Sequence, residues 1–543
     1  MKRLLSFLLL MCLSYGGFTQ VNFVKRLEIS SDFYDDTFEM LRLETGVVAF
    51  RTIPEKGLNF RLVLQFINLD FDLNSEKGLF EYPVRSGYSL VGYDYSDEAA
   101  YLFFQKGTSL NADRYIFKIN LEDNQGFEYE ADNLLGMQLL EFLVENGKAI
   151  FMGDSDGRPA IQIFDLDDKS VHTIQGIYGN DTQIIQIQKL PEIDALQVVI
   201  SRKGQYRNRE IVINTYDFLG NLLREIRVDN FGEENQEILE GILLPPDRYQ
   251  QALIGSYGIE RRDAYQGMYI MDINEFGEYE FKLYTLEDFP GFFNYLPEKL
   301  REKRIAEVEK NAEKGKSNNI REVYSIRSVV PEEDAYYIYF DHYNIINSRG
   351  NNRPGGYRPG RYYRYDQLNR MGYTPFFNDV YNTRMGMNPM AMPVTTEFKY
   401  ISAHFIKVGK EGNVIWDNAS TYDEFGTLYP QPFGEMAVVE NEVYHVYVKD
   451  LIIKMSYFKN GEKIFEDESF EIELVNEEER IRDTNAGSLQ LVHWYGPYYL
   501  LSGNQRVRFL DENNKEDTKD VFFMTKILVE GDAFEAEDAQ EGK

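Results

Sequence analysis

The five histidines are the first candidates for acid–base or metal chemistry, and their spacing supports neither. No two of them form an HExxH or HxH motif. We predict that they fall in separate units of the chain, and a lone histidine beside an apolar strand is usually packed there. We therefore expect no catalytic residue and no metal ligand among His172, His342, His404, His445 and His493.

Other catalytic motifs are missing from the sequence as well. It contains no G-x-S-x-G nucleophile elbow, no Walker loop and no dinucleotide-binding loop. The segment GDSDG, Gly153 to Gly157, has the composition of a calcium loop, but Met152 stands where the first acidic ligand would be, which favours a β-turn. A glycosidase-like pair of carboxylates is defined by separation in space, so the sequence cannot identify one. We expect no enzyme and no cofactor.

Arginine and tyrosine are concentrated in one stretch, NNRPGGYRPGRYYRYDQLNRMGY, from Asn351 to Tyr373. The planar arginine fork suits carboxylates and phosphates, and tyrosine combines apolar area with a polar tip, so both are favoured in recognition surfaces. Candidate ligands are an acidic partner protein, an anionic envelope glycan or lipid headgroup, and the protein's own acidic rim. The predicted contact residues are Arg353, Tyr357, Arg358, Arg361, Tyr362, Tyr363, Arg364 and Arg370.

The next stretch, from Tyr373 to Pro393, is rich in phenylalanine and methionine. It is too apolar for a loop in water, so it either folds back over the protein or forms an adaptable contact with another protein. The contact residues predicted here are Phe376, Phe377, Met385, Met387 and Met390.

The two ends of the chain and its charge limit the setting in which it works. Residues 1–20 have the layout of a secretory signal peptide, with Lys2 and Arg3 before an apolar run, and cleavage is expected after Thr19. The only cysteine, Cys12, lies in that run, so the mature chain would have no disulfide. No other long apolar stretch predicts a membrane span. A net charge of −31 argues against nucleic-acid and anionic-membrane partners, and residues 531–543 read as a disordered acidic tail.

A cadence of four strands parted by turn clusters repeats about every 45–50 residues, as four-stranded propeller blades do. We predict an all-β fold, a β-propeller of seven or eight blades over residues 21–530. Val21 to Ser30 is an isolated strand that would complete the last blade. The cycles are Phe38–Tyr82, Tyr88–Glu130, Leu139–Ile174, Thr182–Val228, Glu237–Glu287, Arg321–Ser420, Gly434–Val475 and Ser488–Leu528.

Two insertions break the cadence. The first, at about 290–319, is predicted to contain a surface helix from Glu298 to Lys314, because good helix formers follow Pro297 and precede Gly315. The second, at about 347–396, carries the Arg/Tyr and Phe/Met stretches and joins the second and third strands of its blade. The first joins a fourth strand to the next blade. Connections of these two kinds emerge on the same side of antiparallel blades, so we expect both insertions side by side on one face.

The cadence, the signal peptide and phrases such as FIKVGKEGNVIWDN, from Phe405 to Asn418, carry a resemblance. The chain resembles exported β-propeller proteins of the bacterial envelope, particularly those of bacteria that use type 9 secretion. The resemblance implies a periplasmic, outer-membrane-associated or cell-surface protein. We expect a non-enzymatic scaffold or binding subunit that acts through protein–protein contacts, with a place beside an outer-membrane export or assembly complex left open. The alternatives are a binding module for an anionic glycan or peptide, and a glycan-active propeller enzyme.

Overall fold

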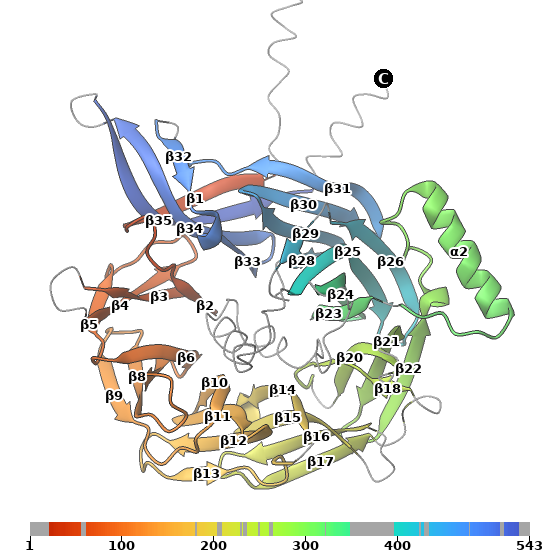
Figure 1. Cartoon of the computed structure of the whole chain (residues 1–543), viewed down its shortest axis with the longest axis horizontal. Coiled ribbons are helices and arrows are strands. Elements are labelled where there is room, and N and C mark those ends of the chain that lie inside the picture. The colour runs from red at the N-terminus through yellow and green to blue at the C-terminus, as the bar shows by residue number, and fades with distance from the viewer. Residues whose placement is uncertain are drawn as a thin grey trace, which may run out of the picture. The chain divides into compact units, whose positions relative to one another are not determined.

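Most of the chain folds into antiparallel strands in the computed structural model (Figure 1). The structure describes residues 21–55, 61–179, 182–203, 209–228, 231, 236–247, 250–259, 264–320, 322–347, 396–422, 425–427, 434–476, 478–510 and 515–531. The chain divides into two compact units. The larger unit contains residues 36–433 and 460–467, and the smaller unit contains residues 1–35, 434–459 and 468–543. The predicted signal peptide and most of the predicted tail lie outside the described residues.

The larger unit contains six antiparallel sheets that follow one another along the chain, named blades one to six here. Blade one is β2 (Glu39–Leu43), β3 (Gly46–Pro54), β4 (Leu62–Asp70) and β5 (Phe80–Pro83). Blade two is β6 (Tyr88–Ser96), β7 (Ala99–Lys106), β8 (Arg114–Asn120) and β9 (Gly126–Glu130). Blade three is β10 (Gln138–Glu145), β11 (Lys148–Ser155), β12 (Arg158–Asp165) and β13 (Val171–Thr173). Blade four is β14 (Gln183–Leu190), β15 (Ala195–Lys203), β16 (Arg209–Asp217) and β17 (Leu222–Val228).

The remaining two blades of this unit are less regular. Blade five divides its first strand into β18 (Glu237–Ile238) and β19 (Ile242–Leu243), followed by β20 (Gln251–Ile259), β21 (Ala264–Ile273) and β22 (Tyr279–Thr285). Blade six is β23 (Val323–Pro331), β24 (Ala335–Asn347), β25 (Thr396–Gly409) and β26 (Val414–Thr421), with β27 (Gly426–Thr427) paired to β25.

Two further sheets, blades seven and eight, involve the smaller unit. Blade seven is β28 (Glu435–Val439), β29 (Glu442–Lys449), β30 (Ile452–Lys459) and β31 (Glu462–Glu471). Blade eight combines β33 (Gln490–Tyr495), β34 (Tyr498–Leu510) and β35 (Glu516–Val529) with the N-terminal strand β1 (Val21–Ser30), and β32 (Arg480–Thr484) pairs with the far end of β34. The pairing of Val21 with Val529 confirms that the first strand completes the last blade. The fold is therefore a β-propeller of eight blades, at the upper of the two predicted numbers.

Central strands of the blades are buried on both faces, and this explains their composition. The second strands of blades one and two, GVVAFRTIP and AAYLFFQK, are near-continuous runs of apolar residues. Such runs are typical of strands that are covered on both sides, whereas the residues of the fourth strands are exposed or only partly buried. Within the larger unit, apolar clusters join each of blades one to five to the next one along the chain.

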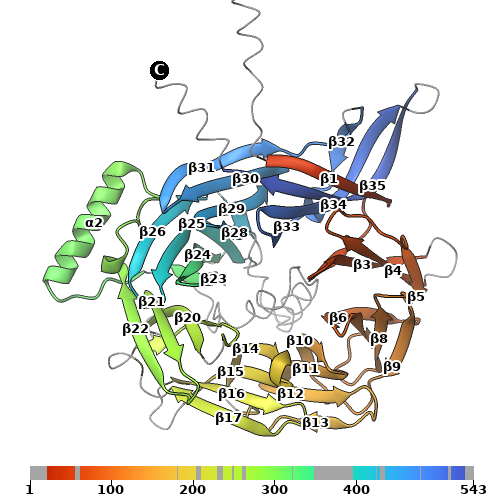
Figure 2. The ribbon, with the colours of Figure 1, turned by 180° about the vertical axis from the view of Figure 1, so that it is seen from behind.

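Helix α2 (Glu298–Glu313) confirms the predicted helix nearly to the residue. It lies at the outer edge of the larger unit, beside β22 and β26, and not across a face of the blades (Figures 1 and 2). No residue of α2 is buried, and Val308 packs only partly against the apolar cluster of blades five and six. The thin apolar stripe explains the difference from the prediction, because it offers too little apolar surface to cover the blade ends.

The second insertion falls almost entirely outside the described residues. The strands on either side of it remain paired to their ends, with Asn347 opposite Thr396. The predicted position side by side with the first insertion therefore stays a prediction. Within the described ranges, no helix is long and apolar enough to cross a membrane.

Lys189 joins three blades of the larger unit. Its ammonium lies 3.2 Å from Asp94 of blade two and 3.2 Å from Glu145 of blade three, and it donates to the carbonyls of Tyr95 and Val144 at 3.0 and 2.9 Å. Both carboxylates are largely buried. A buried carboxylate needs such a partner, because its removal from water is costly.

We predict that Lys189→Met destabilises the protein by about 2–3 kcal/mol, since it leaves two buried carboxylates without their cation. The measurement is the midpoint of urea unfolding followed by tryptophan fluorescence. The control is Lys106→Met, which breaks the exposed pair with Asp113 and should change stability by less than about 0.5 kcal/mol. Equal effects of the two substitutions would contradict the prediction.

Candidate functional site

Blade six gathers an unusual set of polar side chains beneath one segment. That segment, residues 289–296, runs from the end of blade five to α2 and is called the cover segment here. Below it lie His342 on β24, Ser402 and His404 on β25, and Glu322 just before β23. The prediction that the histidines fall in separate units is therefore wrong for one pair. The insertion separates His342 from His404 in the sequence, but β24 and β25 are hydrogen-bonded neighbours.

These four side chains form one continuous hydrogen-bonded relay. Glu322 Oε2 lies 3.4 Å from His342 Nε2, His342 Nδ1 lies 3.2 Å from Ser402 Oγ, and Ser402 Oγ lies 2.9 Å from His404 Nε2. The hydrogen bond with His342 lowers the pKa of Glu322 to about 2, although burial opposes the shift, so its carboxylate is the acceptor. His342 Nε2 is then the donor to Glu322, and Ser402 Oγ bridges His342 Nδ1 and His404 Nε2.

The relay contains the residue types of a serine hydrolase site, namely serine, histidine and a carboxylate. Unlike the nucleophile of such a site, its serine is not accessible to solvent. Ser402 is fully buried, and aromatic rings of the cover segment lie over both histidines, with Phe292 centred 4.4 Å from His404 and Tyr295 6.0 Å from His342. Burial, aided by the nearby His342, lowers the pKa of His404 well below its ordinary value, so this imidazole is neutral near pH 7. A nucleophile must reach its substrate, and in this arrangement Ser402 is covered while the two histidines pack against rings of the cover segment.

Asp417 on β26 is the second ionisable group beneath the cover segment. Burial raises its pKa to about 6, and a hydrogen bond from the backbone N–H of Gly291 at 3.1 Å offsets only part of that effect. The segment approaches so closely that a Cβ atom at Gly291 would lie 2.4 Å from the Asp417 carbonyl oxygen. Glycine is therefore required at this position by close approach.

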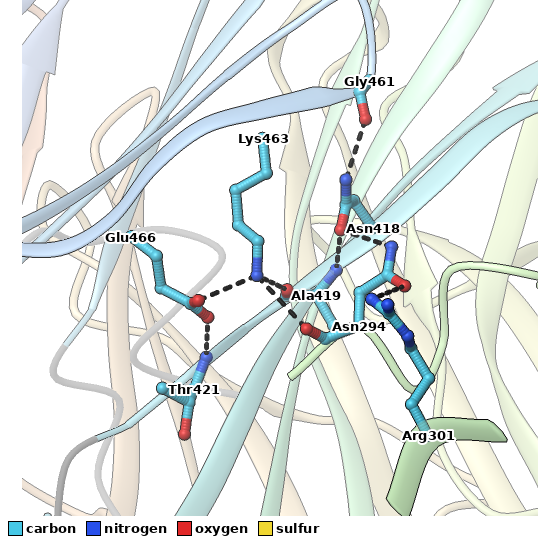
Figure 3. Close-up of polar contacts among 8 residues, drawn as sticks. All are labelled: Asn294, Arg301, Asn418, Ala419, Thr421, Gly461, Lys463 and Glu466. Carbon is cyan, nitrogen blue, oxygen red and sulfur yellow. Dashed lines mark hydrogen bonds and ion pairs between the residues drawn. The ribbon is translucent and has the colours of Figure 1, made fainter. Parts of the chain in front are cut away.

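Amide groups hold the other side of the cover segment (Figure 3). Asn294 donates to Asn418 Oδ1 at 2.9 Å, and Asn418 donates to the carbonyl of Gly461 at 2.9 Å. The Lys463 ammonium donates to the carbonyl oxygens of Asn294 and Ala419, each at 3.2 Å. Lys463 also pairs with Glu466, which accepts from the N–H of Thr421 (Figure 3). The entrance to α2 is thus fixed by directed hydrogen bonds on two sides.

A buried ion pair holds the first two strands of the same blade. Arg327 Nε lies 2.6 Å from Asp341 Oδ2, and both side chains are almost completely buried. Tyr339 and Tyr422 donate to the other carboxylate oxygen at 2.8 and 2.7 Å. Because these partners satisfy the carboxylate, this pair is consistent with a structural role.

The sequence-predicted binding residues cannot be compared with this site. All of them, from Arg353 to Met390, lie outside the described residues.

The other three histidines lie in separate blades. His172 contacts Ser170, His445 is buried on β29, and His493 contacts the Gly496 carbonyl. The N–H of Gly157 donates a hydrogen bond to Asp154 Oδ1, so GDSDG forms a turn, as predicted. In the part of the chain that the structure describes, no group of three or more His, Cys, Asp or Glu side chains is placed to hold a metal ion.

Sequence reasoning missed the relay, the Asp417 contact and the amide network. A signal was present for the relay, because Ser402 and His404 stand two residues apart in one strand and so share a face. No sequence signal indicated that residues 289–296 would cover that face.

Comparisons with known proteins identify a fold and no family. No protein-family model matches the chain, and no curated protein matches it. Among solved structures, the β-propeller domain of the Trilobed protease from Pyrococcus furiosus is 9% identical, with 80% of this chain and 98% of that chain covered and a TM-score of 0.32. The polysaccharide lyase Uly1 is 9% identical, with 94% and 100% covered and a TM-score of 0.36. An acylaminoacyl peptidase is 11% identical with a TM-score of 0.32, and the alignment covers 79% of this chain and 52% of that one.

These structures correct one expectation. The protein was expected not to be an enzyme, but the solved structures to which it is similar are propellers of peptidases and a polysaccharide lyase. The expectation was wrong as stated, because propellers of this kind occur in enzymes. At identities of 9–11% the similarity shows the fold alone.

We predict that Asp417→Asn stabilises the protein at pH 8 by about 1–3 kcal/mol and has little effect near pH 4. The pKa of Asp417 in the folded protein is about 6 and exceeds the ordinary value of 3.8. The contribution of the protonated Asp417 to wild-type stability is therefore fully present below pH 4 and is lost as the pH rises through 6. Asparagine keeps an acceptor for Gly291 without the charge. The measurement is the thermal midpoint at pH 4 and pH 8, and a gain of equal size at both values would contradict the assignment.

We predict that Ser402→Ala lowers stability by about 1–3 kcal/mol, because it leaves one nitrogen of each buried histidine without its partner. The measurement is the free energy of unfolding in urea. Ser469→Ala, at an exposed position of β31, is the control and should be neutral. If both variants were neutral, the relay would not hold blade six.

Proposed function

We propose that the protein binds a partner protein of the cell envelope through a surface on blades five and six. This surface consists of α2 at the outer edge and the insertion at 347–396, with its Arg/Tyr and Phe/Met stretches. The observation that carries the proposal is the fixed presentation of α2. The helix is exposed along its length, yet hydrogen bonds hold the chain at both of its ends.

The cover segment holds the entrance to α2, and a second set of contacts holds its exit. Asn318 donates to the carbonyl of Val308 at 3.1 Å and to Glu287 at 2.6 Å, and it accepts from Asn311 at 2.9 Å. Ile320 and Tyr265 exchange both of their backbone hydrogen bonds. A connection between blades needs only a few residues. A helix that is anchored at both ends but buries none of its own residues is suited to contact another molecule.

The charge of α2 also favours a contact with another protein. Five acidic and five basic residues give it no net charge, in a chain whose net charge is −31. A helix of no net charge in an acidic protein can approach an acidic partner with less repulsion than the surrounding surface. An export or assembly complex of the outer membrane is one such partner, and an anionic glycan or peptide is the alternative ligand for the arginine-rich stretch.

The test replaces residues 298–313 with a Gly/Ser linker and, in a separate variant, deletes the insertion. We expect the linker variant to fold within about 1 kcal/mol of wild type, because no residue of α2 is fully buried. Cross-linking followed by affinity purification from envelope fractions should recover fewer partner proteins with either variant.

The control is Leu79→Ser, an exposed apolar residue in blade one that should leave recovery unchanged. Recovery of the same partners by both variants would contradict the proposal. Unchanged partners, together with loss of binding to anionic glycans on an array, would favour the glycan-binding alternative.

A further inference from the structure

The turns between the third and fourth strands of blades one to six share one construction. In blade four, the N–H of Asp217 donates to the carbonyl of Asn221, and Gly220 donates back to Asp217. The same pair of bonds closes the turns of blades one, five and six, and blades two and three have a version longer by one residue. The third residue of each turn can therefore be compared across the blades as one structural position.

The third position divides the blades into two groups. Blades one, two, three and six carry an exposed carboxylate there, and blades four and five carry a large apolar residue. The carboxylates are Asp72, Glu122, Asp167 and Glu411. The apolar residues are Leu219 and Phe276, with 59% and 79% of their surface exposed. An acidic residue clearly fits this turn, so the geometry of the turn does not explain the exchange for leucine and phenylalanine.

The turn of blade five contacts β17, the strand that begins directly after the turn of blade four. Arg224 on β17 donates to the carbonyl of Asn274, in the turn of blade five, at 2.8 Å. Gly277 of that turn lies beside Ile226, since a Cβ atom there would be 3.3 Å from the isoleucine side chain. Leu222 and Leu223, the first residues of β17, are also about half exposed. Leu219, Leu222, Leu223 and Phe276 are called the apolar tip below.

We propose that the apolar tip is a docking site for a partner protein whose apolar side chains are flanked by lysine or arginine. Acidic residues stand next to these positions in the chain, among them Asp217, Glu225, Glu275 and Glu278. The basic residues of β17 are already engaged, because Arg224 donates to the Asn274 carbonyl and Arg227 pairs with Glu225. Apolar side chains would bind the tip, and basic residues beside them would meet the acidic rim.

The acidic rim also argues against the other occupants. A second copy of this chain would bring the same carboxylates against themselves, in a protein of net charge −31. An anionic membrane would be repelled in the same way. The turns that carry Leu219 and Phe276 emerge at the ends of the strands opposite to the connections that carry α2 and the insertion, because the chain reverses direction at each strand. The two proposals can therefore fail separately.

The test converts the tip into the turn that the other blades use. The double variant Leu219→Asp, Phe276→Glu should fold normally, because Asp72 and Glu411 already occupy the same position in turns of the same length. The probes are two labelled 12-residue peptides of equal charge, one alternating leucine with lysine and one alternating serine with lysine, measured by fluorescence anisotropy. Wild type should bind the leucine peptide about 10- to 100-fold more tightly than the serine peptide, and the double variant should lose that difference.

The matched control is Leu110→Asp, Leu510→Asp, which adds the same charge at two exposed leucines elsewhere and should keep the preference. The proposal is overturned if wild type shows no preference, or if the double variant retains it. It is also overturned by binding to zwitterionic phosphatidylcholine vesicles without binding to the peptide. Dimerisation in sedimentation velocity that the double variant abolishes would equally overturn it, because the occupant would then be a second copy.

Discussion

Burial of the central strands on both faces is the constraint on which the rest of this structure depends. A strand such as GVVAFRTIP exposes neither face, so each sheet is stable only when its neighbours along the chain cover it. Polar side chains inside such a stack must find partners within it. Lys189 with two carboxylates, Arg327 with Asp341, and the serine–histidine relay of blade six all meet this requirement.

Because of the same constraint, the residues that differ in chemical character between blades lie in the turns and connections. Blade interiors tolerate little change, but the third position of a turn accepts aspartate, glutamate, leucine or phenylalanine on an unchanged backbone. The segment between blades five and six accepts a helix, provided that its ends are tied to the sheet. Specific surfaces can therefore be added to one blade without disturbing the others.

Features that depend on residues close together in the chain were predicted from the sequence, and features that depend on residues far apart in the chain were not. Blade boundaries were predicted well because turn residues mark them locally, as at Tyr88 and Glu130. The helix was predicted because its propensity is local, but its position at the outer edge depended on packing. The predicted cycle Arg321–Ser420 already contained His342 and His404, but the relay was missed because it depends on the strand register, which sets His342 opposite Ser402. The predicted binding residues stay predictions, since they lie outside the described part of the chain.

The N-terminal strand has a consequence for the order in which the chain acquires its structure. Val21 is hydrogen-bonded opposite Val529, so the outermost strand of blade eight is made first and finds its place last. Blades one to five can each form from residues that are close in sequence. Blade eight pairs residues 21–30 with residues 516–529, which is a slow, high-contact-order step. Until β35 has been made, β1 has an unpaired edge. Closure of this sheet therefore cannot precede synthesis of β35.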